Sequence, residues 1–342
     1  MQGLGFSMTG PGSVPLIFIM AKYIIKRLIM MIPVLLGITI ITFVIIHLAP
    51  GSPTDALVEA GPNVSYEARE RMETIYGLDR PIHVQYLSWL KRFVFMDFGR
   101  SFKDGRLVVE KIAERLPATL LLEGFSMLLI FLIALPIGII SAARQYSVFD
   151  KVTTVFVFIG FSLPSFWLAL LLMNFFGVKL NLFPIAGMSS VGSEYLSFWG
   201  QLADRTKHLI MPLIVTSFAG LASVSRYMRA GMLEAVRQDY IRTARAKGLS
   251  EKAVIYKHAL RNALLPVVTL VGLSIPGLIG GSFIIETIFA WPGMGRLGYL
   301  AIMARDYPVI MGVGTISAFL TLAGNLVADV LYAWADPRIR YR

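Results

Sequence analysis

The chain has 342 residues, of which 56% are hydrophobic and 15% are charged, and its formal net charge is +11. So apolar a composition excludes a disordered chain and an ordinary water-soluble domain, and it favours a protein whose solvent is lipid. The absence of cysteine excludes disulfides, thiol catalysis and thiolate metal sites, and the four histidines form no HExxH pair that would indicate zinc.

The first 19 residues are uncharged and contain several glycines and prolines, and their apolar part is too short to cross a bilayer. We interpret residues 1–19 as an N-terminal extension. A signal peptide is the alternative, but in signal peptides the positive charges precede the apolar part. Here they follow it, at Lys22, Lys26 and Arg27. Residues 20–48 comprise this basic flank, expected in the cytoplasm, and a first membrane span at 28–48.

A long polar insert, residues 49–115, separates the first span from the rest of the chain. It carries ten basic and ten acidic residues, and balanced charge is typical of a region that is carried across the membrane. We expect it to form short helices on the outer surface. The remaining core domain, 116–342, contains five further apolar stretches, which predict spans at 116–142, 152–178, 208–225 and 262–285 and a last span that ends before Pro337.

Proline and glycine occur inside several of these spans. Pro136 and Pro164 interrupt the second and third spans, where neighbouring helices can absorb a kink, and Gly280 and Gly281 in the fifth would let another backbone approach closely. Six spans place both termini in the cytoplasm. Basic residues then clearly outnumber acidic ones inside and nearly balance them outside, so topology explains the net charge without nucleic acid.

The polar stretch 232–266 lies between two apolar spans and is predominantly basic. Apolar residues at three- and four-residue spacings predict one helix through Leu233, Val236, Tyr240 and Ala244 and another through Tyr256, Ala259, Leu260 and Ala263. Gly248 can close the first helix in the left-handed conformation, and Ser250 can cap the second. The stretch therefore predicts a helical hairpin on a membrane surface.

The sequence of this stretch, DYIRTARAKGLS followed by IYKHALRNALLP, resembles the cytoplasmic coupling loop of permease subunits of binding-protein-dependent ABC importers. Ala244, Gly248 and Leu260 match the general frame of that loop, whereas Arg242, Thr243 and Arg261 depart from it as in the dipeptide and oligopeptide branch. Other motifs also resemble this family, and the resemblance covers about residues 20–342. These motifs are GLDRPIHVQYLSWL, DFGRS, ERLPATLLL, ETIFAWPGMG and GNLVADVLYAWADPRIR.

This resemblance implies an all-α membrane protein with six transmembrane helices in the type I ABC importer permease fold, working by alternating access in the cytoplasmic membrane of a prokaryote. It implies as partners a second homologous permease, two ATPase subunits and an extracytoplasmic substrate-binding protein. The chain has no Gly-x-x-x-x-Gly-Lys-Ser/Thr loop, so ATP and Mg are expected on the ATPase subunits, and no catalytic or metal-binding residue is expected here. Nickel chelates, glutathione and oligosaccharides are rival substrates within the same branch.

The resemblance places the coupling loop at 231–262 and implies contacts with an ATPase from its centre. The residues concerned are Tyr240, Arg242, Thr243, Ala244, Arg245, Lys247, Gly248 and Leu249. The small Ala244 and Gly248 would permit close backbone approach. The alternative is that the basic residues only fix topology and touch lipid headgroups.

Two carboxylates fall inside predicted spans. A charge near the bilayer centre costs about 2.5–3.5 kcal/mol, so Glu123 is expected to face the bundle interior or water, either in the translocation path or in a structural hydrogen bond. For Asp329, near the inner end of the last span, we favour a pairing with a cytoplasmic arginine over a substrate contact. Phe166, Trp167 and Trp291 could line a pathway, although aromatic residues in spans more often pack or anchor at interfaces.

Two rival functions belong to other classes. An ion-coupled secondary transporter would usually need more than two buried carboxylates and would not need a docking hairpin. An intramembrane enzyme is disfavoured because neither HExxH nor Gly-x-Ser-x-Gly occurs.

Overall fold

The structure is a computed structural model that describes residues 16–54, 70–71, 73–75, 77–275 and 277–335. These residues are almost entirely helical or in turns and contain no strand, only an isolated bridge between Arg100 and Leu107. The first helices are α1 (Leu16–Leu48), α4 (Ile82–Val94), α5 (Val108–Ala143), α6 (Val148–Ser162) and α7 (Ser165–Leu172), the last continued by a π-helix (Met173–Lys179). After a short 3₁₀ turn (Ser193–Tyr195) come α8 (Phe198–Val236), α9 (Asp239–Ala246) and α10 (Glu251–Ala253). A second π-helix (Val254–Ala259) leads to α11 (Leu260–Ala263), α12 (Leu265–Ser274), α13 (Gly277–Gly280), α14 (Phe283–Ile288), α15 (Met294–Met303) and α16 (Tyr307–Ala335).

Four helices in the described part are long and apolar enough to cross a membrane: Tyr23–Leu48, Val108–Ala143, Phe198–Val236 and Tyr307–Val330. A fifth crossing would be the pair Val148–Ser162 and Ser165–Lys179, which meet at a bend of 103°. The bend falls where Pro164 was expected to interrupt the third span, because proline cannot continue the hydrogen-bonding of the preceding helix. The predicted helical membrane protein is thus confirmed.

The predicted count of six spans is not confirmed. Over 262–285 the chain forms α11, α12 and α13 in succession instead of one helix. Pro266 sits at the start of α12, and Gly281 adopts a left-handed backbone with φ of +64° that ends the helical run. Glycine was expected to allow close backbone approach in this span, and together with Pro266 it also breaks the helix.

Several helices are longer than the apolar stretches that predicted them. α5 begins at Val108, inside the predicted insert, and α8 runs from Phe198 to Val236 although only 208–225 is apolar enough to predict a span. Ser197 caps α8 by accepting a hydrogen bond from the Gly200 backbone N–H at 3.3 Å. Hydropathy locates the part of a helix that lipid surrounds, and the helix continues into the polar region on either side.

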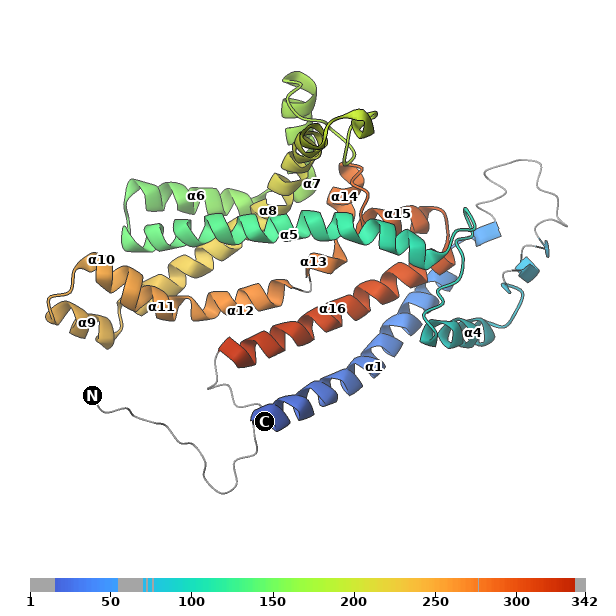
Figure 1. Ribbon diagram of the computed structural model, residues 1–342, viewed down its shortest axis with the longest axis horizontal. Coiled ribbons are helices and arrows are strands. Elements are labelled where there is room, and N and C mark those ends of the chain that lie inside the picture. The colour runs from blue at the N-terminus through green and yellow to red at the C-terminus, as the bar shows by residue number, and fades with distance from the viewer. Residues whose placement is uncertain (1–15, 55–69, 72, 76, 276, 336–342) are drawn as a thin grey trace.

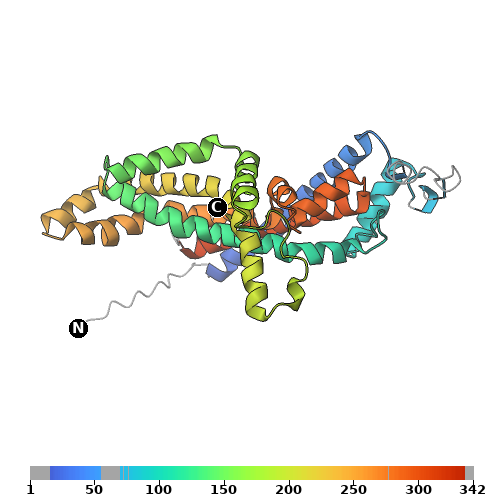
Figure 2. The same cartoon turned by 90° about the horizontal axis from the view of Figure 1, so that it is seen from above.

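The helices form an elongated body with the basic hairpin at one end and α4 at the other (Figure 1). The most extensive helix contact joins α5 to α8, α6 packs on α8, and α1 lies beside α16, as Figure 2 shows from a second direction. Gly138 lets α5 approach α8 closely: a Cβ there would lie 2.7 Å from the Ser225 carbonyl oxygen. In the predicted outer insert, α4 lies on the surface and buries Trp89 against Phe43 of α1 and Met311 of α16.

Candidate coupling surface

The hairpin begins where α8 ends. The predicted single helix through Leu233 and Ala244 is wrong, because the chain breaks at Arg237 and Gln238 and restarts as α9. Gln238 has an extended backbone with φ of −71° and ψ of 152°. The break turns Ile241 inward, where it is fully buried, and leaves Tyr240 exposed.

The turn of the hairpin follows the sequence prediction. Gly248 takes a left-handed conformation with φ of +77°, which residues with a Cβ adopt at a cost, and Ser250 caps the next helix by accepting from the Ala253 backbone N–H at 3.4 Å. Arg245 adds an ion pair across the turn, with its Nε 2.7 Å from Glu251 Oε1. This contact lowers the pKa of the Glu251 carboxyl, because the guanidinium hydrogen bond stabilises the charged form.

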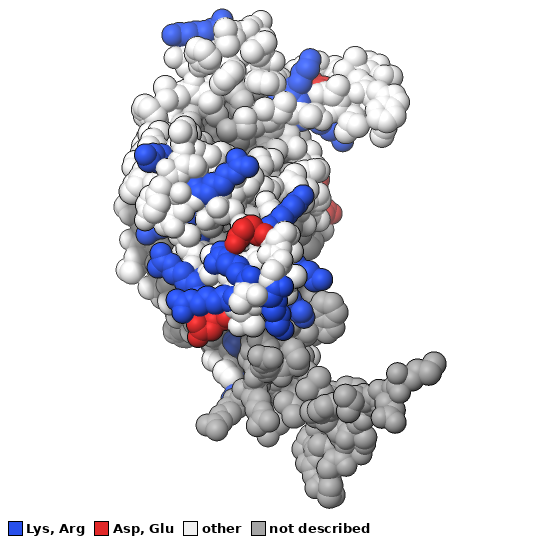
Figure 3. All heavy atoms as spheres, turned by 90° about the vertical axis from the view of Figure 1, so that its left-hand side faces the viewer, with Lys and Arg blue, Asp and Glu red and all other residues white. Residues whose placement is uncertain are grey.

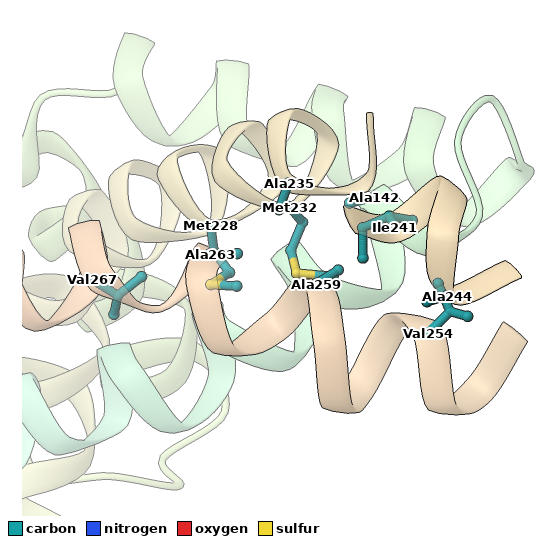
Figure 4. Packing of buried hydrophobic residues seen from close by; sticks show 10 residues of the cluster. All are labelled: Ala142, Met228, Met232, Ala235, Ile241, Ala244, Val254, Ala259, Ala263 and Val267. Carbon is teal, nitrogen blue, oxygen red and sulfur yellow. The ribbon is translucent and has the colours of Figure 1, made fainter. Parts of the chain in front are cut away.

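An apolar cluster anchors the hairpin to the membrane helices. Its members come from α8, α9, the second π-helix, α11 and the ends of α5 and α12, and they point toward one another in Figure 4. They are Ala142, Met228, Met232, Ala235, Ile241, Ala244, Val254, Ala259, Ala263 and Val267. The hairpin is therefore packed directly against α8 and α5.

Ala244 was expected to contact an ATPase, but it belongs to this cluster. The Ala244 side chain is only 6% exposed, so it packs within this chain and is not available to a partner. Gly248 is the opposite case, since an added Cβ would meet nothing within 4 Å. The small size of Ala244 serves the hairpin's own packing, and glycine at 248 serves the turn.

The other expected coupling residues lie on the outside of the hairpin. Exposed there are Tyr240, Arg242, Thr243, Arg245, Lys247 and Leu249. Arg242 contacts Asp239 at 3.4 Å, but both side chains are largely open to water, so the pair contributes little. Figure 3 views this end of the molecule and shows Lys and Arg side chains gathered with few acidic ones between them. Beside Tyr240 lies a cavity of about 330 Å³, also lined by Gln238, Asn262 and Pro266.

Sequence reasoning missed an ion pair just above the hairpin. Arg229 of α8 donates to both carboxylate oxygens of Asp150 at the start of α6, at 2.6 and 2.9 Å, and Asp150 also accepts from Ser141 Oγ and from the Tyr146 backbone N–H. Asp150 is 3% exposed. The ring of contacts fixes the 144–147 loop to α8.

The carboxylates inside the helical body differ in their surroundings. Glu123 is half-buried and forms no hydrogen bond within the described residues. Glu286 of α14 is fully buried and accepts from Thr119 Oγ1 at 2.9 Å and the Arg296 backbone N–H at 3.0 Å. The role of Glu123 in a pathway stays a prediction.

Asp329 of α16 pairs with Arg27 of the basic N-terminal flank at 2.9 Å. This is a pairing of the kind that the sequence favoured. Trp291 is fully buried and donates its indole N–H to the Ala118 carbonyl at 2.9 Å, so it packs within the protein, whereas Phe166 and Trp167 are exposed on α7. Among the described residues, no three His, Asp or Glu side chains are arranged to hold a metal ion.

These features define a polytopic helical membrane protein with a basic hairpin anchored at one end of its helices. The chain belongs to the family described as binding-protein-dependent transport system inner membrane component, whose model matches residues 134–341, and a model for the N-terminal part of such membrane components matches residues 20–123. It is therefore a membrane transport component with the type I importer permease fold, and it is not an enzyme.

The chain is similar to several curated proteins. It is 49% identical to the oligopeptide transport system permease protein AppB of Bacillus subtilis (strain 168) over 94% of this chain and 100% of that protein. It is 40% identical to the dipeptide transport system permease protein DppB of Alkalihalophilus pseudofirmus, with 94% and 100% covered. A solved structure of the MetNI methionine ABC transporter in inward-facing conformations has a TM-score of 0.46 and 17% identity, over 65% of this chain and 97% of that one.

Proposed function

We propose that the chain is the permease subunit of an ATP-driven importer that moves dipeptides or oligopeptides across the cytoplasmic membrane. The observation that carries the proposal is the hairpin at 239–263. Its inner face is packed onto α8 and α5, while Tyr240, Lys247 and Leu249 stay exposed. The names of the two similar permeases support peptide as the substrate class.

The partners follow from this role. Two ATPase subunits would bind ATP and Mg and meet the hairpin, a second permease would complete the pathway, and a binding protein would deliver substrate to the opposite side. The basic hairpin and the basic flank that pairs Arg27 with Asp329 would both lie in the cytoplasm, as would both termini.

The test is mass spectrometry of proteins that co-purify with this chain after gentle extraction from its native membrane. We expect a second permease, ATPase subunits and a binding protein, and the ligand held by that binding protein identifies the substrate. A nickel chelate, glutathione or an oligosaccharide in its place would replace peptide within the same mechanism. If the chain purified alone and moved solute in ATP-free vesicles under an ion gradient, the importer proposal would be wrong.

A further inference from the structure

A second cavity lies between α5, α6 and α8, next to the Asp150–Arg229 ion pair and on the membrane side of it. Its volume is about 300 Å³. The three helices run side by side in both views of the molecule, with the 144–147 loop closing their end (Figures 1 and 2). The coupling hairpin makes no part of its lining, so the cavity is separate from the surface described above.

One side of the cavity is polar and carries positive charge. Arg226 and Arg229 line it, one turn apart on α8, together with the hydroxyl-bearing Ser141 and Thr153. Arg229 is neutralised by Asp150, but its Nη1 group makes no hydrogen bond within the described residues. Arg226 forms no ion pair there either, so the cavity keeps one net positive charge.

The other side is apolar and opens onto the outer face of α6. Val157, Phe158 and Phe161 line it, and Phe158 is 68% exposed. Val152 and Val155 extend this exposed apolar face along the same helix. Because α6 belongs to a candidate membrane crossing, such a face fits acyl chains. Arg229 lies against Asp150 where α6 begins, so the charged side of the cavity is at one end of that crossing, where a headgroup would lie.

We propose that this cavity binds one anionic phospholipid, with the headgroup phosphate at Arg226 and the free edge of Arg229 and the acyl chains along Val157, Phe158 and Phe161. Guanidinium groups match phosphate oxygens through paired hydrogen bonds, and basic pockets between membrane helices suit anionic headgroups. A free phosphate or a soluble anion would leave the apolar side without a partner. The bound lipid would brace α6 against α8 directly above the coupling hairpin.

The absence of cysteine makes a single-site probe possible. A fluorophore on Val155→Cys, outside the cavity lining but on the same face of α6, reports the lipid beside it in the full-length chain. Vesicles of phosphatidylcholine receive a small amount of spin-labelled phosphatidylglycerol or of spin-labelled phosphatidylcholine with the same chains. We expect the anionic lipid to quench about five-fold more effectively at equal concentration. A probe on Val44→Cys, exposed on α1, should show no such preference.

The substitution Arg226→Gln should abolish the preference at Val155→Cys, while Arg237→Gln, which removes the same charge from an exposed residue just after α8, should keep it. If both substitutions reduced the preference for the anionic lipid equally, the preference would come from the overall charge of the protein, and this result would overturn the proposal. So would displacement of the lipid by glycerol phosphate in solution, or no quenching by either lipid, which would mean that protein covers this face. If Arg226→Gln does not fold, the comparison of the Val155→Cys and Val44→Cys probes in the chain that keeps Arg226 still tests the proposal.

Discussion

Arg229 and Asp150 are 79 positions apart in the chain, yet two hydrogen bonds of 2.6 and 2.9 Å hold their side chains together. The pair joins the start of α6 to α8 only two turns before α8 ends and the hairpin begins. It therefore connects α6 to α8 close to the point where the coupling surface begins.

Replacing Asp150 by Asn removes the charge that balances Arg229 and should weaken this connection. Removing one partner of a buried pair costs about 3–5 kcal/mol, and Arg229 is partly exposed, so we expect the lower part of that range or less. Thermal unfolding of the purified chain should move down by several degrees. Asp239→Asn, in the exposed pair with Arg242, is the matched control and should leave the transition unchanged. Equal transitions for both variants would mean that the buried pair does not stabilise the protein.

Gly248 gives a prediction about coupling. Its φ of +77° requires a left-handed backbone, while the space around it is open. Gly248→Asn should be tolerated, because asparagine adopts this conformation more readily than other residues. Gly248→Arg should stay in the membrane but uncouple transport from ATP hydrolysis, because it adds strain and bulk at the tip that would meet the ATPase. The rates of substrate transport and of ATP hydrolysis are measured for each variant in reconstituted vesicles. If both rates were unchanged in Gly248→Arg, the proposed role of the tip would be contradicted.

Neighbouring residues in α9 separate anchoring from docking. Ile241 is fully buried in the hairpin cluster, so Ile241→Ala should cost about 2–5 kcal/mol and lower the stability of the chain itself. Tyr240 is 38% exposed, and Tyr240→Ala should leave that stability within about 0.5 kcal/mol. Its effect should instead be weaker retention of the ATPase subunits during purification. The assignment of the two faces would be reversed if Tyr240→Ala unfolded the chain and Ile241→Ala only released the ATPase.

The hairpin shows which features the sequence can predict and which it cannot. The turn could be predicted, because Gly248 and Ser250 act on their own neighbours and carry local signals. The inward face of α9 could not, because periodicity assumes an unbroken helix and the chain breaks at Gln238. The Asp150–Arg229 pair depends on two helices meeting in space, which no local pattern encodes. Hydropathy found the apolar stretches but not their breaks, as the succession of α11, α12 and α13 shows.

Asp104, at the end of the molecule opposite the hairpin, offers a pH test. Asp104 lies 2.7 Å from Lys111 Nζ. Partial burial acts to raise its pKa, but hydrogen bonds from Lys111 and Ser101 prevail and lower it to about 2. A depressed pKa in the folded state means that the contact stabilises the protein above the ordinary pKa near 3.8 and is lost as the pH falls toward 2.

Asp104 is 40% exposed, so solvent screening limits the contribution to less than about 1 kcal/mol. At pH 7 the unmodified chain should have a slightly higher melting temperature than Asp104→Asn. The difference between the two melting temperatures should disappear as the pH is lowered below 4. A difference that stayed constant over this range would assign the effect to packing instead of charge.

The contact between α5 and α8 gives the last prediction. Gly138 faces α8 so closely that an added Cβ would lie 2.6 Å from Met228 Cβ and 2.7 Å from the Ser225 carbonyl oxygen, and backbone cannot move aside as a flexible side chain can. Gly124, on the same helix, has nothing within 4 Å of the same position. In a helix interior alanine is otherwise favoured over glycine by about 1 kcal/mol, so Gly124→Ala should be neutral or stabilising. Gly138→Ala should destabilise by about 1–3 kcal/mol through overpacking. Denaturant titration of both variants measures the difference, and equal stability would show that the two helices can separate without cost at this point.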